Sequence, residues 1–346
     1  MIKFRKIEQF RDAVKSVTNS AYYKNAKRDE NGEIIPGQPV TWRLPELEFT
    51  GTVKLHGTNS SWVYDFNTET LVCQSRNRVL TVGDDNAGFA LWTESFKDKL
   101  IEAIKEEYDG ITVDKLVVYG EWCGPGIQKG VALSQLDRKI FVIFESVLIF
   151  GDGEDETRVY NTDNNVFTFE RDDVHTIYEF PTYRIKIDFN HPALAQNEMI
   201  AITEAVEAEC PVGKALGVSG VGEGVVWSYR GNPNSSGIMF KVKGEKHSIS
   251  KVKTLASVDV EAYQNVIDFV NGVVTENRCN QGIDYLNEMN IEVNVKATPD
   301  FLRWIVNDVL TEEATTIVEN NLDGKTINRE VAKKAREWFF AKLQDF

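Results

Sequence analysis

The pattern of apolar residues changes near residue 248, and this change constrains the fold more than any other feature of the sequence. Before it, short runs rich in β-branched and aromatic residues are bounded by Gly, Asn, Asp or Pro, which is typical of strands joined by turns. After it, apolar residues recur with the period of amphipathic helices. The sequence therefore predicts an α+β domain over residues 1–247 and a small all-α domain over residues 248–346.

Within these domains, individual elements can be predicted from the same patterns. Six runs are predicted as strands, at residues 60–66, 69–75, 115–122, 139–150, 223–229 and 238–244. Helices are predicted within residues 88–108, 260–274, 298–321 and 328–344. Thr298-Pro299-Asp300 predicts an N-cap, a proline in the first position and an acid in the first turn. The acid-rich residues 151–165 predict a loop or a mobile hairpin, and residues 27–39 an inserted hairpin or loop.

Charge and cysteine usage narrow the functional class. A net charge of −14 over 346 residues argues against a protein that coats nucleic acid through charge alone. The charge is uneven, since residues 151–223 carry 15 acids and 5 bases, whereas residues 224–247 carry 4 bases and 1 acid. A local basic site is therefore compatible with the acidic chain. Four widely spaced cysteines without a CxxC pair argue against zinc or a disulfide framework, and favour a reducing compartment.

The sequence Lys54-Leu55-His56-Gly57 lies between two apolar runs that predict the arms of a hairpin. In an extended strand Lys54 and His56 point to the same face, and Gly57 allows a sharp turn or a close backbone approach. A lysine acts as a nucleophile only when it is unprotonated, a state that apolar flanks and neighbouring cations favour. By itself, this motif does not distinguish a nucleophile from a solvated lysine.

Three further features have the chemistry to bind a nucleotide. Arg76 and Arg78, in a predicted strand, suit bidentate contact with phosphate, with a surface ion pair as the alternative. Glu121 ends an apolar run before a Gly-Pro-Gly turn, where it could accept hydrogen bonds from ribose hydroxyls or cap the turn. Phe141 and Phe144 could stack on a purine, although most phenylalanines on such strands belong to the core.

Two features suit phosphates and a metal ion. Glu223 lies between two glycines just before a strand and could reach a metal, or serve only as a turn acid. Strict alternation in "GIMFKVKGEKHS" puts Lys241 and Lys243 on one strand face and Phe240 on the other. Two neighbouring lysines repel each other unless an anion lies between them, and triphosphate is a natural candidate; a solvated edge strand is the alternative.

In this order, "KLHGTN", "GEWCGPGIQKG", "EGVV" and "FKVKG" resemble the motifs of the covalent nucleotidyltransferases, which include ATP-dependent DNA and RNA ligases and mRNA capping enzymes. The Lys-X-His-Gly motif looks most like the phage-type RNA ligase 2 branch, since DNA ligases and capping enzymes commonly have Lys-X-Asp-Gly. The resemblance covers residues 50–247, and the helical tail also fits the branch. It implies an ATP-grasp-like ligase adenylation domain of antiparallel sheets with flanking helices.

By this resemblance, the catalytic residues are Lys54, His56, Glu223, Lys241 and Lys243. Lys54 would become covalently attached to AMP, with the motif histidine His56 beside it. Glu223 would support a metal ion, while Lys241 and Lys243 would contact the ATP phosphates. The implied cofactors are ATP, as the donor of AMP, and Mg²⁺, with Mn²⁺ as a substitute.

The resemblance also implies residues that surround the nucleotide. Arg76 would contact phosphate and Glu121 the ribose, while Phe141 would stack on adenine. Glu145 stands where the third motif usually has Asp, so Phe144 is an alternative to Phe141. The segment before Lys54 is longer than expected for the branch, and residues 151–173 have no counterpart in it.

The implied function is that of an ATP-dependent RNA ligase, which joins RNA 3′-hydroxyl and 5′-phosphate ends through Lys–AMP and AppRNA intermediates and seals nicks in RNA repair. Its partner would be duplex or nicked RNA. We expect no membrane association, and we assume a monomer in the cytoplasm (the host cytoplasm if the chain is phage-encoded). The alternatives are a capping-type guanylyltransferase, which the motif histidine and helical tail disfavour, and an inactive RNA-binding relative, although Lys54, Glu223 and Lys241 are all present.

Overall fold

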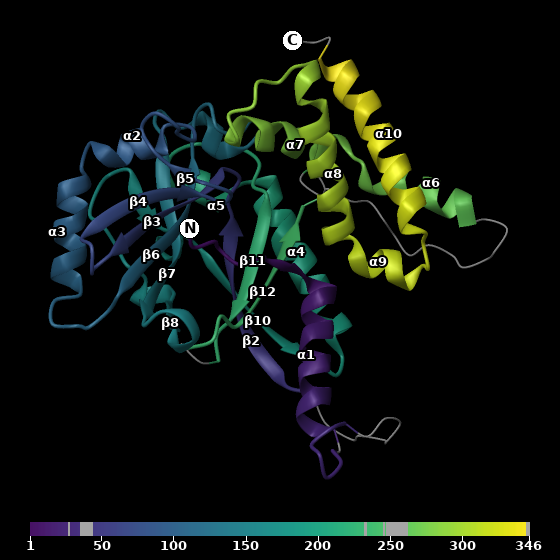
Figure 1. The fold of residues 1–346 in the computed structure, drawn as a ribbon, viewed down its shortest axis with the longest axis horizontal. Coiled ribbons are helices and arrows are strands. Elements are labelled where there is room, and N and C mark those ends of the chain that lie inside the picture. Colours follow the sequence, from purple (N-terminus) through teal and green to yellow (C-terminus); the bar gives the residue numbers. More distant parts are fainter. Residues whose placement is uncertain (27, 35–43, 232–233, 245, 247–261, 344–346) are drawn as a thin grey trace. The chain divides into compact units, whose positions relative to one another are not determined.

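The computed structural model describes residues 1–26, 28–34, 44–231, 234–244, 246 and 262–343 (Figure 1). The chain forms two compact units, Met1–Gly244 and Glu245–Phe346. Within the described residues, every strand belongs to the first unit, whereas the second is helical. The α+β class predicted from the apolar pattern is therefore confirmed. The predicted domain boundary, between residues 247 and 248, lies outside the described residues.

A five-stranded sheet carries the first set of candidate site residues. Its strands, in order across the sheet, are β1 (Glu8–Gln9), β12 (Ile238–Lys243), β11 (Gly224–Tyr229), β2 (Glu46–Lys54) and β10 (Thr182–Asp188). Alternation gives this sheet two different faces. Phe49, Val53 and Phe240 are buried on the apolar face, and the opposite face presents Lys54 and Lys243.

A seven-stranded sheet carries the second set. Its main order is β5 (Val79–Leu80), β4 (Thr70–Ser75), β3 (Thr58–Asp65), β6 (Lys115–Cys123), β7 (Ile140–Phe150) and β8 (Thr157–Asn161), and β9 (Val174–Thr176) pairs with β7. All six runs predicted as strands form strands in one of the two sheets. The acid-rich segment contributes β8, which pairs antiparallel with β7 and so forms a hairpin.

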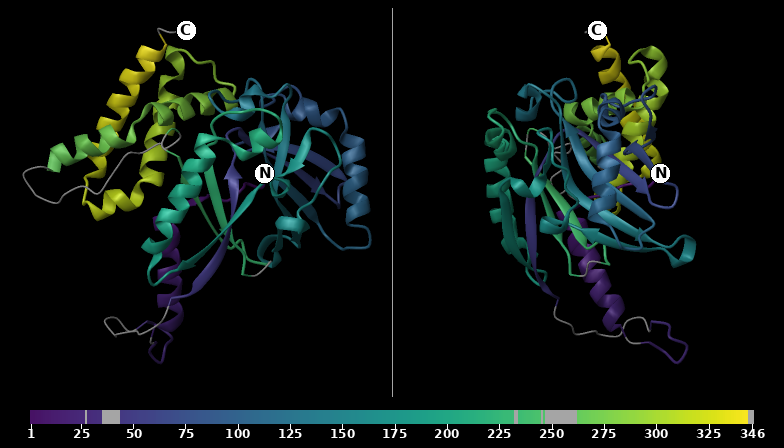
Figure 2. Two further views of the ribbon diagram at one scale, coloured as in Figure 1. Left: turned by 180° about the vertical axis from the view of Figure 1, so that it is seen from behind. Right: turned by 90° about the vertical axis from the view of Figure 1, so that its left-hand side faces the viewer.

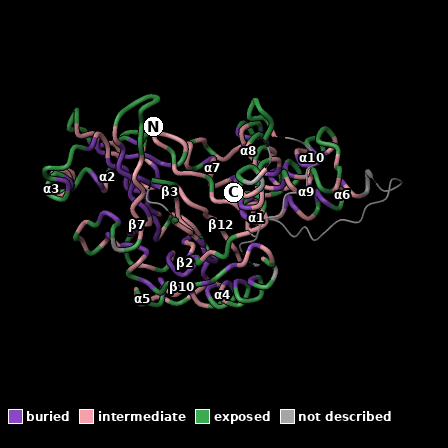
Figure 3. The backbone as a smooth tube through the Cα atoms, turned by 90° about the horizontal axis from the view of Figure 1, so that it is seen from below, coloured by how far each residue is buried: buried purple, intermediate pink, exposed green. Residues whose placement is uncertain are grey.

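Helices cover the apolar faces of both sheets. In the first unit they are α1 (Phe10–Asn25), α2 (Phe89–Glu94), α3 (Lys97–Glu107), α4 (Gln196–Ala208) and α5 (Pro211–Ala215). Ala13 of α1 and Met199 of α4 are buried in the core of the five-stranded sheet. The left panel of Figure 2 shows the ribbon from behind, with α4 in teal. Leu100 and Ile104 of α3 lie in the core of the seven-stranded sheet. Figure 3 shows the contrast between the buried strands and the exposed outer side of α3.

The connection through Lys54 and Gly57 differs from the predicted hairpin. β2 ends at Lys54 and β3 begins at Thr58, but β2 belongs to the five-stranded sheet and β3 to the seven-stranded sheet. The hairpin prediction is therefore wrong, because strands consecutive in sequence need not pair with each other. The segment instead crosses from the five-stranded sheet to the seven-stranded sheet.

The second unit is built from α6 (Ala262–Val273), α7 (Glu276–Glu288), α8 (Thr298–Glu312), α9 (Ala314–Glu319) and α10 (Gly324–Lys342). Its core includes Phe269, Phe301 and Phe339, in agreement with the helical periodicity. The predicted N-cap role of Thr298 is wrong by one position, because Thr298 is already helical and its hydroxyl donates to the Val295 carbonyl. No helix among the described residues is long and apolar enough to span a membrane.

Candidate functional site

The site is organised by Gly224, at the start of the central strand β11. Gly224 is the register partner of Lys54 on β2 and of Lys243 on β12, so the two lysines flank the residue that follows Glu223. A side chain at Gly224 would collide with the backbone, since an added Cβ would lie 2.2 Å from the Val242 carbonyl oxygen. The residues "EGVV" thus place one carboxylate between two lysines from neighbouring strands.

Glu223 is the centre of this charge cluster. Its Oε2 lies 2.7 Å from Lys54 Nζ and 3.4 Å from His56 Nδ1, and its Oε1 lies 2.9 Å from Lys243 Nζ. The residue is 2 % exposed. Burial by itself would raise the pKa of the Glu223 carboxyl, but Lys243 and Lys54 outweigh burial and hold that pKa well below its usual range. Glu223 is therefore ionised at neutral pH.

Glu121 comes to the same site from the other sheet. The pairing of β3 with β6 sets Asn59 opposite Glu121, and Glu121 Oε1 accepts a hydrogen bond of 3.0 Å from the Gly57 backbone N–H. Burial raises the pKa of Glu121, and the nearby Lys54 opposes that shift. The structure thus brings together Lys54, His56, Glu121, Glu223 and Lys243, all of which were selected from the sequence.

Lys241 and Arg76 take different positions. Lys241 lies two residues before Lys243 on the same face of β12, with Val226 as its register partner. Arg76 is exposed and lies in the bend between β4 and β5, not on a strand as predicted. Its neighbour Arg78 forms an ion pair with Asp84, which is the alternative considered from the sequence. None of the contacts among the described residues joins Arg76 to the Glu223 cluster.

Phe141 belongs to the hydrophobic core. It is fully buried, and its ring centroid lies 4.7 Å from that of Trp62 and 5.0 Å from that of Phe89. Its register partner is Trp122, whereas Glu121 pairs with Val142. The prediction that Phe141 stacks on adenine is therefore corrected, because its ring is on the apolar face of the sheet. Phe144, the alternative, is the one interior residue of β7 that is not buried.

The motif order and the geometry agree with a comparison against protein families. A family model described as RNA ligase matches residues 47–243, more than half of the chain. The chain belongs to the RNA ligase family. The matched range includes every residue proposed above for the site, from Lys54 to Lys243.

Among solved structures, this family member is similar to several of Naegleria gruberi RNA ligase. They include a mutant with ATP and Mn at 17 % identity, the ligase with PPi at 18 % and a mutant with AMP and Mn at 16 %, each with a TM-score of 0.40. The matches cover 71 % of this chain and 57 %, 56 % and 56 % of those chains. The chain thus spans little more than half the length of these ligases.

Two polar residues of this RNA ligase family member support the Lys54 motif without having been assigned from the sequence. Gln128 Nε2 donates to the Gly57 carbonyl oxygen at 3.3 Å, and Asn86 Nδ2 donates to Thr58 Oγ1 at 2.8 Å. Gln128 lies in "GEWCGPGIQKG", one of the sequences that resemble the covalent nucleotidyltransferase motifs. Asn86 lies outside every motif, so the sequence contains no signal for it.

Gly57 is required by close packing, which leads to a stability prediction. An added Cβ would lie 2.4 Å from the Trp122 carbonyl oxygen and 2.8 Å from Cys123 Cβ. We expect Gly57→Ala to lower the free energy of unfolding by about 1–3 kcal/mol in urea denaturation, because such overpacking forces the backbone to shift. Gly83→Ala is the control, since an added Cβ there meets nothing within 4 Å. Equal stability of the two variants would contradict this packing.

Proposed function

We propose that the protein is an ATP-dependent RNA ligase that joins RNA 3′-hydroxyl and 5′-phosphate ends through a lysyl-adenylate, with nick sealing in RNA repair as its role. The observation that carries the proposal is the contact of Lys54 Nζ with the buried, ionised Glu223, which also holds His56 and Lys243. A nucleophile, an anion that orients it and cations for phosphate are the groups that such a transfer needs.

In the first step, the Lys54 amine loses a proton and attacks the α-phosphorus of ATP. The N–P bond forms as the P–O bond to pyrophosphate breaks, and a second proton leaves to solvent as the phosphoramidate forms. Glu223 holds Nζ in position from 2.7 Å. Lys243 and Lys241, on the same face of β12, neutralise charge on the phosphates.

The other nucleotide contacts are proposed from position. Glu121, already bonded to the Gly57 N–H, would accept from the ribose hydroxyls, and Arg76 would contact a phosphate from its exposed bend. Stacking on adenine is proposed for Phe144, since Phe141 is in the core. His56 remains beside Lys54 through their shared partner, Glu223.

A divalent metal ion is compatible with the residues present. Among the described residues, no group of three His, Cys, Asp or Glu side chains is arranged to hold a metal. Mg²⁺, however, is commonly bound by one or two carboxylates together with substrate phosphates and waters. Glu223, whose pKa is held low, would be the protein ligand of Mg²⁺ or Mn²⁺ accompanying ATP. Such an ion would supply further charge neutralisation at the phosphates.

In the next two transfers, AMP passes from Lys54 to the RNA 5′-phosphate, and the RNA 3′-hydroxyl then attacks that activated end and releases AMP. We propose that the helical unit helps to hold the RNA. Its helix α10 carries six Lys or Arg residues against two Glu. Four of the basic residues are exposed at helical spacing on one side of α10: Lys325, Arg329, Lys333 and Arg336. Basic side chains so placed can neutralise successive phosphates.

The first test uses the full chain, Mg²⁺ and ATP labelled at the α-phosphate. We expect label to remain on the denatured protein, as required for a phosphoramidate, and to leave as AMP when RNA with a 5′-phosphate is added. Labelled GTP is the matched probe, because a capping-type guanylyltransferase would take label from GTP instead. Absence of any adduct from ATP would overturn the proposal and leave the inactive RNA-binding relative as the better description.

A second measurement identifies the substrate. Nicked duplex, hairpin and single-stranded RNA, each with the same 5′-phosphate and 3′-hydroxyl, are offered at two salt concentrations. If α10 contacts the RNA backbone, sealing of nicked duplex falls with salt more steeply than adenylation does. Equal sealing of all three RNAs would contradict the assignment to nick repair.

A further inference from the structure

A β-bulge changes which side chains of β7 face the site. The register between β6 and β7 shifts at Tyr119 and Gly120, so that Gly120 pairs with Ile143 but Tyr119 pairs with Glu145. Phe144 is the extra residue. Strict alternation would have kept Glu145 on the face of Ile143, in the core; the bulge moves it to the face of Tyr119 instead. A bulge of this kind re-aims side chains, and here it turns Glu145 out of the core while the Phe144 side chain stays partly buried.

The N-terminal segment covers this face of the seven-stranded sheet. The Ile2 backbone N–H donates to Gln74 Oε1 at 2.8 Å, and the Tyr119 hydroxyl donates to the Ile2 carbonyl at 3.2 Å. The Phe4 ring lies edge-on to Phe144, with 5.0 Å between ring centroids, and 5.1 Å from Tyr119. A few residues later the chain reaches the other sheet, where β1 pairs with β12.

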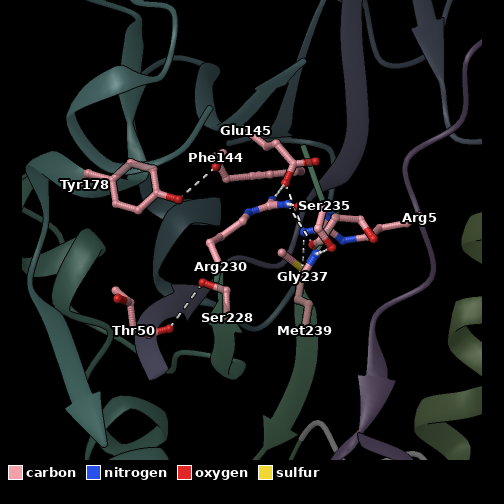
Figure 4. Close-up of polar contacts among 11 residues, drawn as sticks. Arg5, Thr50, Phe144, Glu145, Tyr178, Ser228, Arg230, Ser235, Gly237 and Met239 are labelled. Carbon is pink, nitrogen blue, oxygen red and sulfur yellow. Dashed lines mark hydrogen bonds and ion pairs between the residues drawn. The ribbon is translucent and has the colours of Figure 1, made fainter. Parts of the chain in front are cut away.

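Arg5 lies at the middle of this segment and contacts both sheets (Figure 4). Its Nη2 donates to Glu145 Oε2 at 3.0 Å and lies 3.8 Å from Met239 Sδ on β12. Arg230, immediately after β11, also binds Glu145 Oε2. Both guanidinium groups lie over the Tyr160 ring, at 5.6 Å for Arg5 and 5.0 Å for Arg230. Residues from four parts of the chain thus meet at Glu145.

Burying Arg5, Arg230 and Glu145 together carries a large desolvation penalty. Two guanidinium groups share one carboxylate that is 1 % exposed. Within the described part of the chain, Arg5 Nε, Arg5 Nη1 and Arg230 Nε have no hydrogen-bond partner. Burial lowers the pKa of Arg5 to about 10 and that of Arg230 to about 9. Desolvating these charged groups offsets the gain from their mutual attraction. The network is therefore better explained by the positions it imposes on its residues than by a gain in stability.

We propose that Arg5 is a positioning residue for the nucleotide base. By binding Glu145 and contacting Met239, it fixes the neighbouring Phe144 as the stacking surface, at a set distance from the lysines of β12. The Tyr178 hydroxyl, which donates to the Phe144 carbonyl at 3.0 Å, holds the same residue from the other side (Figure 4). The inference rests on the proposed use of ATP, and Arg5 lies outside the residues that the family model matches.

The test measures adenylation of the full chain in single turnovers over a range of ATP concentrations. For Arg5→Ala we expect the half-saturating ATP concentration to rise about tenfold while the maximal rate changes less than about twofold, because base binding is lost and Lys54 is untouched. Arg5→Lys, which retains one charged bond to Glu145, should give an intermediate rise. Lys3→Ala is the control, since Lys3 is exposed on the same segment, and it should match the unmodified protein.

Three outcomes would overturn the inference: an unchanged half-saturating concentration in Arg5→Ala, a fall in maximal rate alone, or the same change in Lys3→Ala. If Arg5→Ala does not fold, the half-saturating ATP concentration of Arg5→Lys decides instead. Binding of a fluorescent ATP analogue separates this inference from the proposed function. A protein that binds the analogue but forms no adduct fails the proposed function only, and the dissociation constants of the Arg5 variants still decide the role of Arg5.

Discussion

Lys54→Ala is expected to form no covalent adduct with labelled ATP, and Lys54→Arg is expected to fail equally. The arginine variant retains a positive charge beside Glu223, so its failure would show that a nucleophilic amine, not a cation, is required. We expect adenylation to fall by at least about 10³-fold in both variants. The measurement is the amount of label on denatured protein after a single turnover.

Loss of the adduct must be separated from loss of the fold. In Lys54→Ala, Glu223 still has Lys243 and His56 as partners, so the variant should remain folded. RNA that already carries an adenylated 5′ end needs no lysyl-adenylate, and we therefore expect Lys54→Ala to seal it. Lys115→Ala removes a lysine that pairs with Asp65 at the surface, and it should behave like the unmodified protein. An adduct that persists in Lys54→Ala would contradict the mechanism.

Much of the fold is predictable because local patterns decide it. The pleat of a strand is enough to predict that Phe240 lies on one face and Lys241 and Lys243 on the other. In the structure Phe240 is buried and Lys243 forms an ion pair with Glu223. The helices of the second unit follow from apolar periodicity in the same way. The order of the motifs selects Lys54 and Glu223 for one site, and their Nζ–Oε2 contact of 2.7 Å is in keeping with that choice.

The features that were missed depend on contacts distant in sequence. The crossover at Lys54 depends on which strands pair with each other in each sheet, and local sequence patterns do not contain that information. Phe141 was assigned to adenine by resemblance, and its position opposite Trp122 on the core face depends on the pairing of β7 with β6. Arg5 and Glu145 are 140 positions apart, so no spacing rule could have joined them.

Glu223→Gln is expected to reduce adenylation by about 10²–10³-fold while preserving the shape of the side chain. The amide has no negative charge to orient Lys54 Nζ, and it leaves Lys54 and Lys243 facing each other without the anion that separates them. The control is Glu209→Gln, because Glu209 forms an ion pair with Lys214 at the surface. Full activity in Glu223→Gln would remove the main support for the proposed chemistry.

Glu223→Gln also tests how the stability of the folded protein depends on pH. Because the pKa of Glu223 is lowered in the folded state, its ion pairs contribute stability that is fully present above its ordinary pKa of about 4.5. That contribution is lost as the pH falls through the lowered, folded-state pKa. At pH 7, removal of one partner from such a buried cluster should cost about 3–5 kcal/mol in the free energy of unfolding.

The difference in unfolding free energy between the unmodified protein and Glu223→Gln should therefore shrink as the pH falls below about 4.5. For Glu209→Gln, we expect a difference of at most about 1 kcal/mol at pH 7, since its ion pair is exposed and screened by solvent. Urea denaturation of all three proteins from pH 7 downward provides the measurement. A difference for Glu223→Gln that stays constant over this range would mean that the amide loses shape or hydrogen bonds rather than charge. The low pKa of Glu223 would then not be what stabilises the site.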